Sequence, residues 1–269
     1  HGDRIEALAN DEYLSAHPHW QRESVFSTRS EHAYLFDYEA ALVRVPLGGE
    51  SDGGVAELFA EPGVRAACPR PRPGDDAAVA FVHDGSGYDA VYGVGGDGAD
   101  DSPAPIYGVP ETEVAAPEWN DAGDRIAVTA TSDGRAHVHT VDVDGALADA
   151  GPGLGAEPGE AAGATALATG DGIHGAPRWN GDRVLSVRET PTEPPAVVDA
   201  ASGERLTPTA TAGLSARLPT PEAFTYDSDG TAVHAMVHPP ETDPDPESVP
   251  LLVKPHGGPT AFDGFGFDH

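Results

Sequence analysis

The chain has 269 residues, of which 39% are hydrophobic, and this is enough for one or two domains with buried cores. It contains 45 Asp and Glu against 15 Lys and Arg, which gives a formal net charge of −30 at pH 7. This balance excludes nucleic acid as a partner, because a phosphate backbone is bound by basic surfaces.

The acidic composition has two interpretations. A disordered acidic chain would lack strand-forming residues, but aromatic and β-branched residues occur in strand-like runs along the sequence. A folded chain of this charge is favoured where salt screens the repulsion, and the composition, in which Lys254 is the only lysine, resembles proteins of extreme halophiles. Cys68 is the single cysteine, and neither a signal-peptide pattern nor a membrane-length apolar run is present. We expect a halophilic, cytoplasmic protein with no membrane partner.

A repeat runs through the first two hundred residues. Ala116–Asn120 reads Ala-Pro-Glu-Trp-Asn and precedes the strand pattern Gly123–Val128, and Ala176–Asn180 with Gly181–Val187 repeats the arrangement. Degenerate copies begin at Cys68–Pro71 and at His17–Trp20, so that the anchors fall roughly 50 residues apart. Each Trp holds the same place in its repeat, which predicts a core position.

Strand and turn signals dominate this region, and helical periodicity is almost absent. Ala127–Thr131, the turn at 132–134 and Ala136–Val143 form the clearest hairpin, and four short strands per repeat are typical of a β-propeller blade. A β-sandwich is the alternative, although the returning motif favours the propeller. Because Gly-Asp-Arg-Ile at 2–5 matches the later repeats, we expect an N-terminally incomplete propeller over residues 1–218.

The pattern changes after residue 218. A hairpin is predicted from the strand 222–226, the turn 227–231 and the strand 233–239, and an acidic, Pro-rich connection follows. Val249–Pro255 is then a short apolar run, typical of a strand that is covered on both faces. We expect residues 219–269 to be the start of a truncated α/β-hydrolase domain, so that the whole chain is mainly β.

The apolar run leads directly into His256-Gly257-Gly258-Pro259. Adjacent glycines after a buried strand allow close approach of a substrate, and in α/β-hydrolases such a loop gives one backbone N–H to the oxyanion hole. Gly258 N–H is the predicted donor, and His256 is expected to brace the loop rather than to act as a base.

Taken in order, the propeller-type repeats, the Phe224-Thr225-Tyr226 strand, the Asp-Gly-Thr turn, the Pro-rich connection and His256–Pro259 resemble the prolyl oligopeptidase superfamily of serine peptidases. The His-Gly-Gly-Pro form points to the acylaminoacyl-peptidase and dipeptidyl-aminopeptidase branch. The resemblance implies a propeller that caps an α/β-hydrolase domain and restricts access to a site that hydrolyses short or N-acylated peptides.

The same resemblance implies a nucleophile in a Gly-x-Ser-x-Gly elbow, which the 269 residues do not contain. Only the oxyanion-loop positions His256, Gly257, Gly258 and Pro259 can be transferred, so we expect a fragment that is inactive alone. Two alternatives stay open. One is a propeller scaffold with a vestigial tail, and the other is half of a split enzyme whose remaining hydrolase part comes from another chain.

Weaker signals have simpler interpretations. His137 with His139, and His17 with His19, have the spacing of metal ligands, but without a further ligand cluster they are expected to be solvent-facing strand residues. The Gly/Asp-rich segment 95–100 is expected to be an acidic turn rather than a calcium site. The sequence therefore predicts no metal site and no cofactor.

Overall fold

In the computed structural model, the residues whose positions can be described are 13–18, 23–29, 41–46, 56–95, 103–143, 164–168, 171–208, 218–240, 249–255 and 263–267. Throughout these ranges the regular secondary structure is β-strand, and no helix occurs among them. It follows that no helix in this part of the chain could cross a membrane. The predicted fold class, mainly β, is confirmed.

The first two sheets each have four antiparallel strands in sequence order. Blade 1 consists of β1 (Tyr13–Pro18), β2 (Glu23–Arg29), β3 (Leu42–Pro46) and β4 (Ala56–Phe59). Blade 2 consists of β5 (Ala66–Arg72), β6 (Asp75–His83), β7 (Ala90–Val94) and β8 (Ala104–Tyr107).

The next two blades are joined into one sheet. Blade 3 consists of β9 (Glu113–Trp119), β10 (Arg125–Ser132), β11 (Arg135–Asp142) and β12 (Ala164–Ala166), and blade 4 of β14 (Arg178–Asn180), β15 (Arg183–Thr190) and β16 (Glu193–Asp199). The short strand β13 (Ile173–His174) pairs in parallel with β11 and antiparallel with β15, so it links the two blades. The prediction of hairpin repeats is confirmed.

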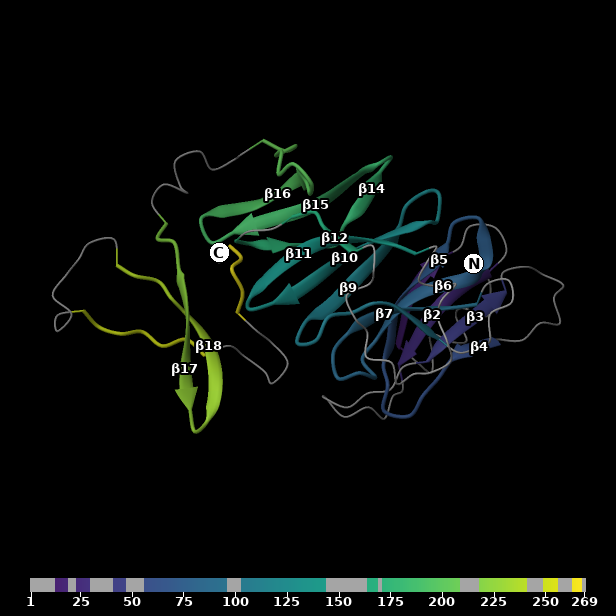
Figure 1. Cartoon of the computed structure of the whole chain (residues 1–269), viewed down its shortest axis with the longest axis horizontal. Helices are drawn as coiled ribbons and strands as arrows, with labels where there is room; N and C mark the ends of the chain where they lie inside the picture. The colour runs from purple at the N-terminus through teal and green to yellow at the C-terminus, as the bar shows by residue number, and fades with distance from the viewer. Residues whose placement is uncertain are drawn as a thin grey trace.

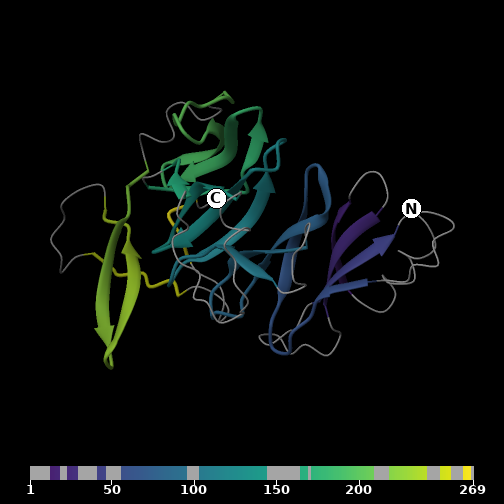
Figure 2. The ribbon, with the colours of Figure 1, turned by 45° about the vertical axis from the view of Figure 1, so that its right-hand side comes forward.

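The blades stand side by side in an arc (Figures 1 and 2). The first strand of each blade lies next to the first strand of its neighbour, since β1 contacts β5, β5 contacts β9 and β9 contacts β14. This radial arrangement is that of a partial β-propeller rather than of two facing sheets.

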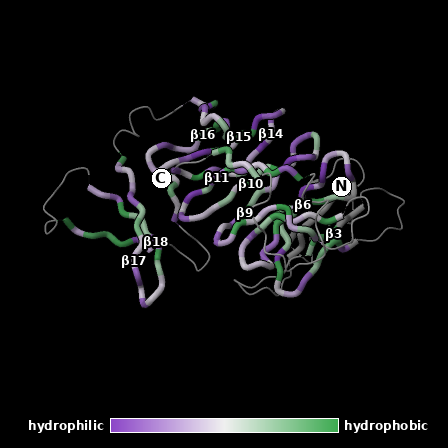
Figure 3. The backbone as a smooth tube through the Cα atoms, in the orientation of Figure 1, coloured by the Kyte–Doolittle hydropathy of each residue, from purple (hydrophilic) through white to green (hydrophobic). Residues whose placement is uncertain are grey.

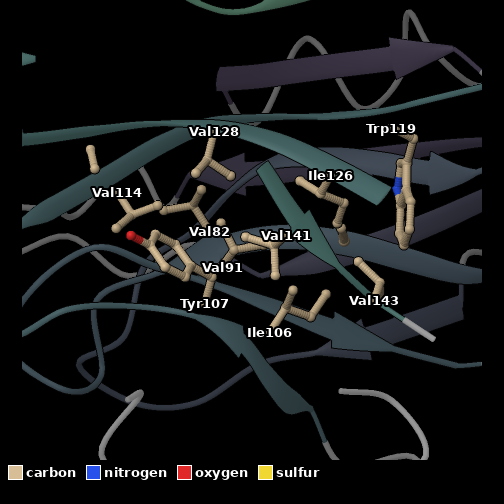
Figure 4. Close-up of a cluster of buried hydrophobic side chains, with 12 residues drawn as sticks. Val82, Val91, Ile106, Tyr107, Val114, Trp119, Ile126, Val128, Val141 and Val143 are labelled. Carbon is tan, nitrogen blue, oxygen red and sulfur yellow. The ribbon is translucent and has the colours of Figure 1, made fainter. Parts of the chain in front are cut away.

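The cores lie between the blades, so blades 2 and 3 are buried on both faces. On β6, Val79 and Phe81 face blade 1, whereas Ala80 and Val82 face blade 3. The largest cluster joins blades 2 and 3, and Figure 4 shows its side chains interdigitating from both. Burial on both faces explains the continuous apolar run in β6, because alternating polar positions would place polar groups in a core.

The repeated Trp residues make the same contact in successive blades. Trp119 Nε1 donates to the Arg70 carbonyl oxygen at 2.9 Å, and Trp179 Nε1 donates to the Glu118 carbonyl oxygen at 2.9 Å. In both cases the acceptor lies in the preceding blade, one residue before the position that matches the Trp: Arg70 precedes Pro71, and Glu118 precedes Trp119. The expected core role is confirmed for Trp119, which is buried, and Trp179 packs at the edge of a core cluster. Trp20 lies outside the described residues.

A β-bulge accompanies the repeat in two blades. Cys68 and Ala116 precede the repeated prolines and have φ values of 53° and 52°, which are unusual for residues other than glycine. The register of each strand with its partner shifts at these positions. Such bulges redirect the following side chains. Here Glu118 Oε2 reaches both neighbouring blades, at 3.3 Å from Arg70 Nε and 3.0 Å from Arg178 Nη1.

The prediction that His137 and His139 face solvent is wrong. His139 Nδ1 lies 2.9 Å from the Tyr107 hydroxyl of blade 2, and His137 Nδ1 is buried without a hydrogen-bond partner in the described part of the chain. Both side chains share a face of β11 with the buried Val141. Because blade 2 covers that face, the alternation in β11 does not mark a surface in contact with water.

Candidate active site

The predicted oxyanion loop itself, His256, Gly257, Gly258 and Pro259, lies outside the described residues. Its role therefore stays a prediction. The site can be built from the elements around it, which are the hairpin before it, the apolar segment 249–255 and the segment 263–267 after it.

The hairpin consists of β17 (Glu222–Ser228) and β18 (Thr231–Val237), paired from Glu222↔Val237 to Ser228↔Thr231. Its two-residue turn at Asp229-Gly230 is the predicted one. The hairpin projects to one side of the blades (Figure 1), and every residue of β17 is exposed. Phe224 and Tyr226 are 46% and 48% exposed, although aromatic residues in strands normally pack against a neighbour.

The strand predicted at Val249–Pro255 is not present as a strand. The segment is extended and exposed, with Leu251, Leu252 and Val253 at 83%, 91% and 73% exposure. An apolar run predicts burial in a sheet, but a strand also needs a hydrogen-bonding neighbour, and no described strand pairs with this segment. Figure 3 shows hydrophobic colour along this segment, whose leucine and valine side chains are exposed.

A groove of about 400 Å³ lies where the hairpin meets the propeller. Its walls come from β18, from the β10–β11 turn and from the segment that follows the predicted oxyanion loop. The lining residues are Glu113, Thr131, Ser132, Asp133, Gly134, His234, Ala235, Met236 and Asp263. Three carboxylates and one imidazole thus face a space between the two predicted domains.

The segment after the predicted loop is held against the propeller. Phe265 is only 2% exposed, and its backbone N–H donates to the Gly134 carbonyl oxygen at 2.7 Å. The Arg135 guanidinium lies over the Phe265 ring, 3.9 Å from its centroid. Sequence reasoning missed this contact, because Gly264-Phe265-Gly266-Phe267 has no periodicity and a single aromatic residue between glycines does not indicate a partner.

A buried histidine and a buried serine lie away from the groove. His174 Nδ1 is 2.7 Å from Ser186 Oγ in the sheet that joins blades 3 and 4, and burial, with Arg188 and His137 nearby, lowers the pKa of His174 to about 4. Both side chains are less than 9% exposed. A serine next to a histidine is the usual arrangement of a nucleophile and its base, but this pair has no access for a substrate.

Candidate metal ligands do not gather within the described ranges, where no group of three or more His, Cys, Asp or Glu side chains could hold an ion. The hairpin turn 227–231 and the turn at Gly85-Ser86-Gly87 are ordinary strand connections there.

Together, the four blades and the following hairpin form a partial β-propeller with a hairpin attached to it. No protein-family model and no curated protein sequence matches the chain. Among solved structures, it is similar to a puromycin-hydrolyzing peptidase of Mycobacterium tuberculosis, with a TM-score of 0.70 and 20% identity over 95% of this chain and 39% of that one. The acylaminoacyl peptidase of Pyrococcus horikoshii matches with a TM-score of 0.64 and 18% identity, over 95% of this chain and 37% of that one. A third similar structure comes from work on two prolyl endopeptidases. It has a TM-score of 0.58 and 13% identity, over 84% of this chain and 31% of that one.

At these identities the likeness establishes the fold. The propeller fold that the predicted resemblance to the prolyl oligopeptidase superfamily implies is confirmed. The chain spans less than two fifths of the length of each of these solved proteins.

Proposed function

We propose that this chain is part of a serine-type peptidase that hydrolyses short or N-acylated peptides. The observation that carries the proposal is the order of elements: propeller blades, then the β17–β18 hairpin, then the apolar segment leading to His256–Pro259. The same fold occurs in solved peptidases of this kind. A propeller scaffold alone would not need an oxyanion-type loop at the end of such a hairpin.

In the proposed reaction, the Gly258 N–H donates to the oxygen that becomes negative as the peptide carbonyl is attacked. A preorganised donor of this kind contributes about 10²–10³ in kcat, because it stabilises the tetrahedral intermediate more than the substrate. His256, Gly257 and Pro259 set the path of the loop. The domain boundary near residue 218 belongs to the same proposal.

The nucleophile and its base must come from outside these residues, since the 269 residues contain no Gly-x-Ser-x-Gly and no serine after Pro259. We propose that the chain alone is inactive and that a polypeptide with the rest of the hydrolase domain completes it. The exposed ring pair Phe224–Tyr226 and the exposed segment Leu251–Val253 support this, because both leave apolar surface uncovered that the rest of a hydrolase sheet would cover.

The groove between the propeller and the hairpin is the proposed route for the peptide, with the propeller limiting access. Its carboxylates are Glu113, Asp133 and Asp263. The net charge of −30 on the chain is compatible with concentrated salt, which screens the repulsion between such groups. A halophilic, cytoplasmic setting is part of the proposal.

The proposal is tested by mixing the purified chain with a polypeptide that carries the remaining hydrolase domain and measuring hydrolysis of an acyl-aminoacyl anilide. We expect turnover only in the mixture. Gly258→Pro, which removes the N–H, should lower kcat by about 10²–10³. Gly175→Ala is a control, because a Cβ there meets nothing closer than 3.6 Å. Equal activity of Gly258→Pro and the wild type would contradict the assigned donor.

A scaffold function has one observation in its favour. The three core clusters and both indole bonds lie wholly within the blades and include no residue of the hairpin. If a chain ending at Pro219 is as stable as the full chain and the mixture shows no turnover, the scaffold interpretation replaces the peptidase one.

A further inference from the structure

The contact between the propeller and the segment 263–267 combines a buried ring, a backbone hydrogen bond and a guanidinium stacked on the ring. The docking site consists of Gly134 and Arg135 in the β10–β11 turn, with Ile173 and Glu189 beside them. Phe265 supplies both a ring and a backbone N–H to it. An aromatic ring under a guanidinium gains attraction from its quadrupole as well as from burial.

The site is shaped closely around the segment. Gly134 has a φ of +71°, and a Cβ there would meet the Asp263 carbonyl oxygen at 3.4 Å and the Gly264 Cα at 3.5 Å. On the other side, a Cβ at Gly266 would lie 2.7 Å from Glu189 Oε1. The positive φ favours glycine at position 134, whereas the contact at Gly266 is with the end of the flexible Glu189 side chain.

Arg135 is held in place by a second partner. Its Nε donates to Asp171 Oδ1 at 2.9 Å, which directs the guanidinium along the end of blade 3. The guanidinium above Phe265 therefore also has a partner within the propeller.

Phe265 is buried, but it lies outside the contacts that form the blades. The β10–β11 hairpin is closed by its own register, which ends at Ser132↔Arg135. None of the three core clusters of the described chain includes Phe265. What the docking does build is a wall of the groove, since Asp263 and Gly134 both line it.

We propose that Phe265 is a positioning residue, which fixes the chain on the C-terminal side of His256–Pro259 to the propeller through Gly134 and Arg135. The proposal rests on the proposed function for the role of that loop. Phe265 follows Pro259 by so few residues that the chain between them spans roughly 20 Å at most. The docking thus limits where the end of the predicted oxyanion loop can lie relative to the groove.

The first test is hydrogen exchange with mass spectrometry on the full chain, which requires no catalytic activity. Phe265→Ala should speed exchange in the peptides that cover 256–267 and the 132–135 turn by roughly 10- to 100-fold, as expected for loss of one buried aromatic side chain. Exchange in the strand centres around Val128 and Val138 should stay unchanged. Phe224→Ala makes the same chemical change at an exposed site and should leave 256–267 as in the wild type.

Two results would overturn the proposal. One is unchanged exchange over 256–267 in Phe265→Ala, and the other is faster exchange throughout blade 3, which would make Phe265 a general structural residue. Phe265→Leu keeps apolar volume but lacks the ring face, so it should fall between wild type and Phe265→Ala.

The second test uses the mixture with the remaining hydrolase domain. Phe265→Ala should lower kcat at least tenfold with a smaller change in KM, since a misplaced oxyanion loop affects the transition state more than binding. A change in KM alone would contradict positioning. If the wild-type mixture shows no turnover, the proposed function fails, and the exchange experiment still decides whether Phe265 anchors the segment.

Discussion

Acid should destabilise the contact between blades 1 and 2 through His83. This side chain is 2% exposed and stacks on Tyr92, with ring centroids 3.5 Å apart. Its Nδ1 accepts the Gly85 N–H at 3.0 Å, and its buried Nε2 has no hydrogen-bond partner within the described chain. Burial lowers the pKa of His83 from 6.5 to about 4, and the nearby Asp84 offsets only part of this.

The sign follows from where the proton binds. Below pH 6.5 the unfolded chain protonates this imidazole, whereas the folded chain resists until about pH 4, so stability falls as the pH falls through this window. The gap between the two pKa values corresponds to about 3 kcal/mol at its full extent, and to about 2 kcal/mol at pH 5.

The assay is denaturant unfolding at pH 8 and pH 5 in constant high salt, followed by Trp fluorescence. His83→Phe keeps an aromatic ring and loses one hydrogen bond, so it should cost about 1 kcal/mol at pH 8. Between pH 8 and pH 5 the wild type should lose about 2 kcal/mol more than the variant. His174, whose pKa is lowered in the same direction, is present in both chains and cancels in this difference.

The matched control is His234→Phe on the exposed hairpin strand, which should follow the wild type at both pH values. The control also accounts for carboxylate titration, which relieves the negative charge equally in all three chains. If His83→Phe loses as much stability on acidification as the wild type, the explanation from buried His83 is refuted.

Three further outcomes are expected. Trp119→Phe removes the indole donor to the Arg70 carbonyl and should lower the unfolding free energy by about 1 kcal/mol in denaturant melts; an unchanged midpoint would show that this bond contributes nothing. Hydrogen bonds from Arg183 and from Ser202 lower the pKa of Asp199 to about 2. Asp199→Asn should therefore lower the unfolding free energy most above pH 4, and this effect should disappear as the pH falls toward 2. A loss of unfolding free energy that does not change with pH would count against the ion pair. Raising KCl from 0.1 to 1 M shortens the screening length from about 10 to about 3 Å and should raise Tm; a fall in Tm would exclude charge repulsion as the limiting term.

Much of the propeller could be predicted because its repeat carries local signals. The Pro-x-Trp motif, the Asp133-Gly134 turn and the alternating apolar residues each specify a strand or a turn within a few residues. The indole bonds of Trp119 and Trp179 then follow from one repeated geometry.

The features that the sequence did not predict share a different cause, since they depend on contacts between residues that are far apart in the sequence. An apolar pattern at Val249–Val253 predicts a strand, but pairing needs a neighbour that no local signal supplies. His137 and His139 alternate with apolar residues as surface histidines would, yet another blade covers their face. Phe265 has no periodic context, so its docking on Arg135 could be found only in three dimensions.

The central claim is tested most directly by labelling with a fluorophosphonate that reacts with activated serines. The chain alone should take up no label, because its buried Ser186 lies next to His174 without access and no serine follows Pro259. In the mixture with the remaining hydrolase domain, label should appear on that polypeptide and fall when Gly258→Pro replaces the wild-type chain. Stoichiometric labelling of a serine in this chain, or labelling of the partner that ignores Gly258, would contradict the account.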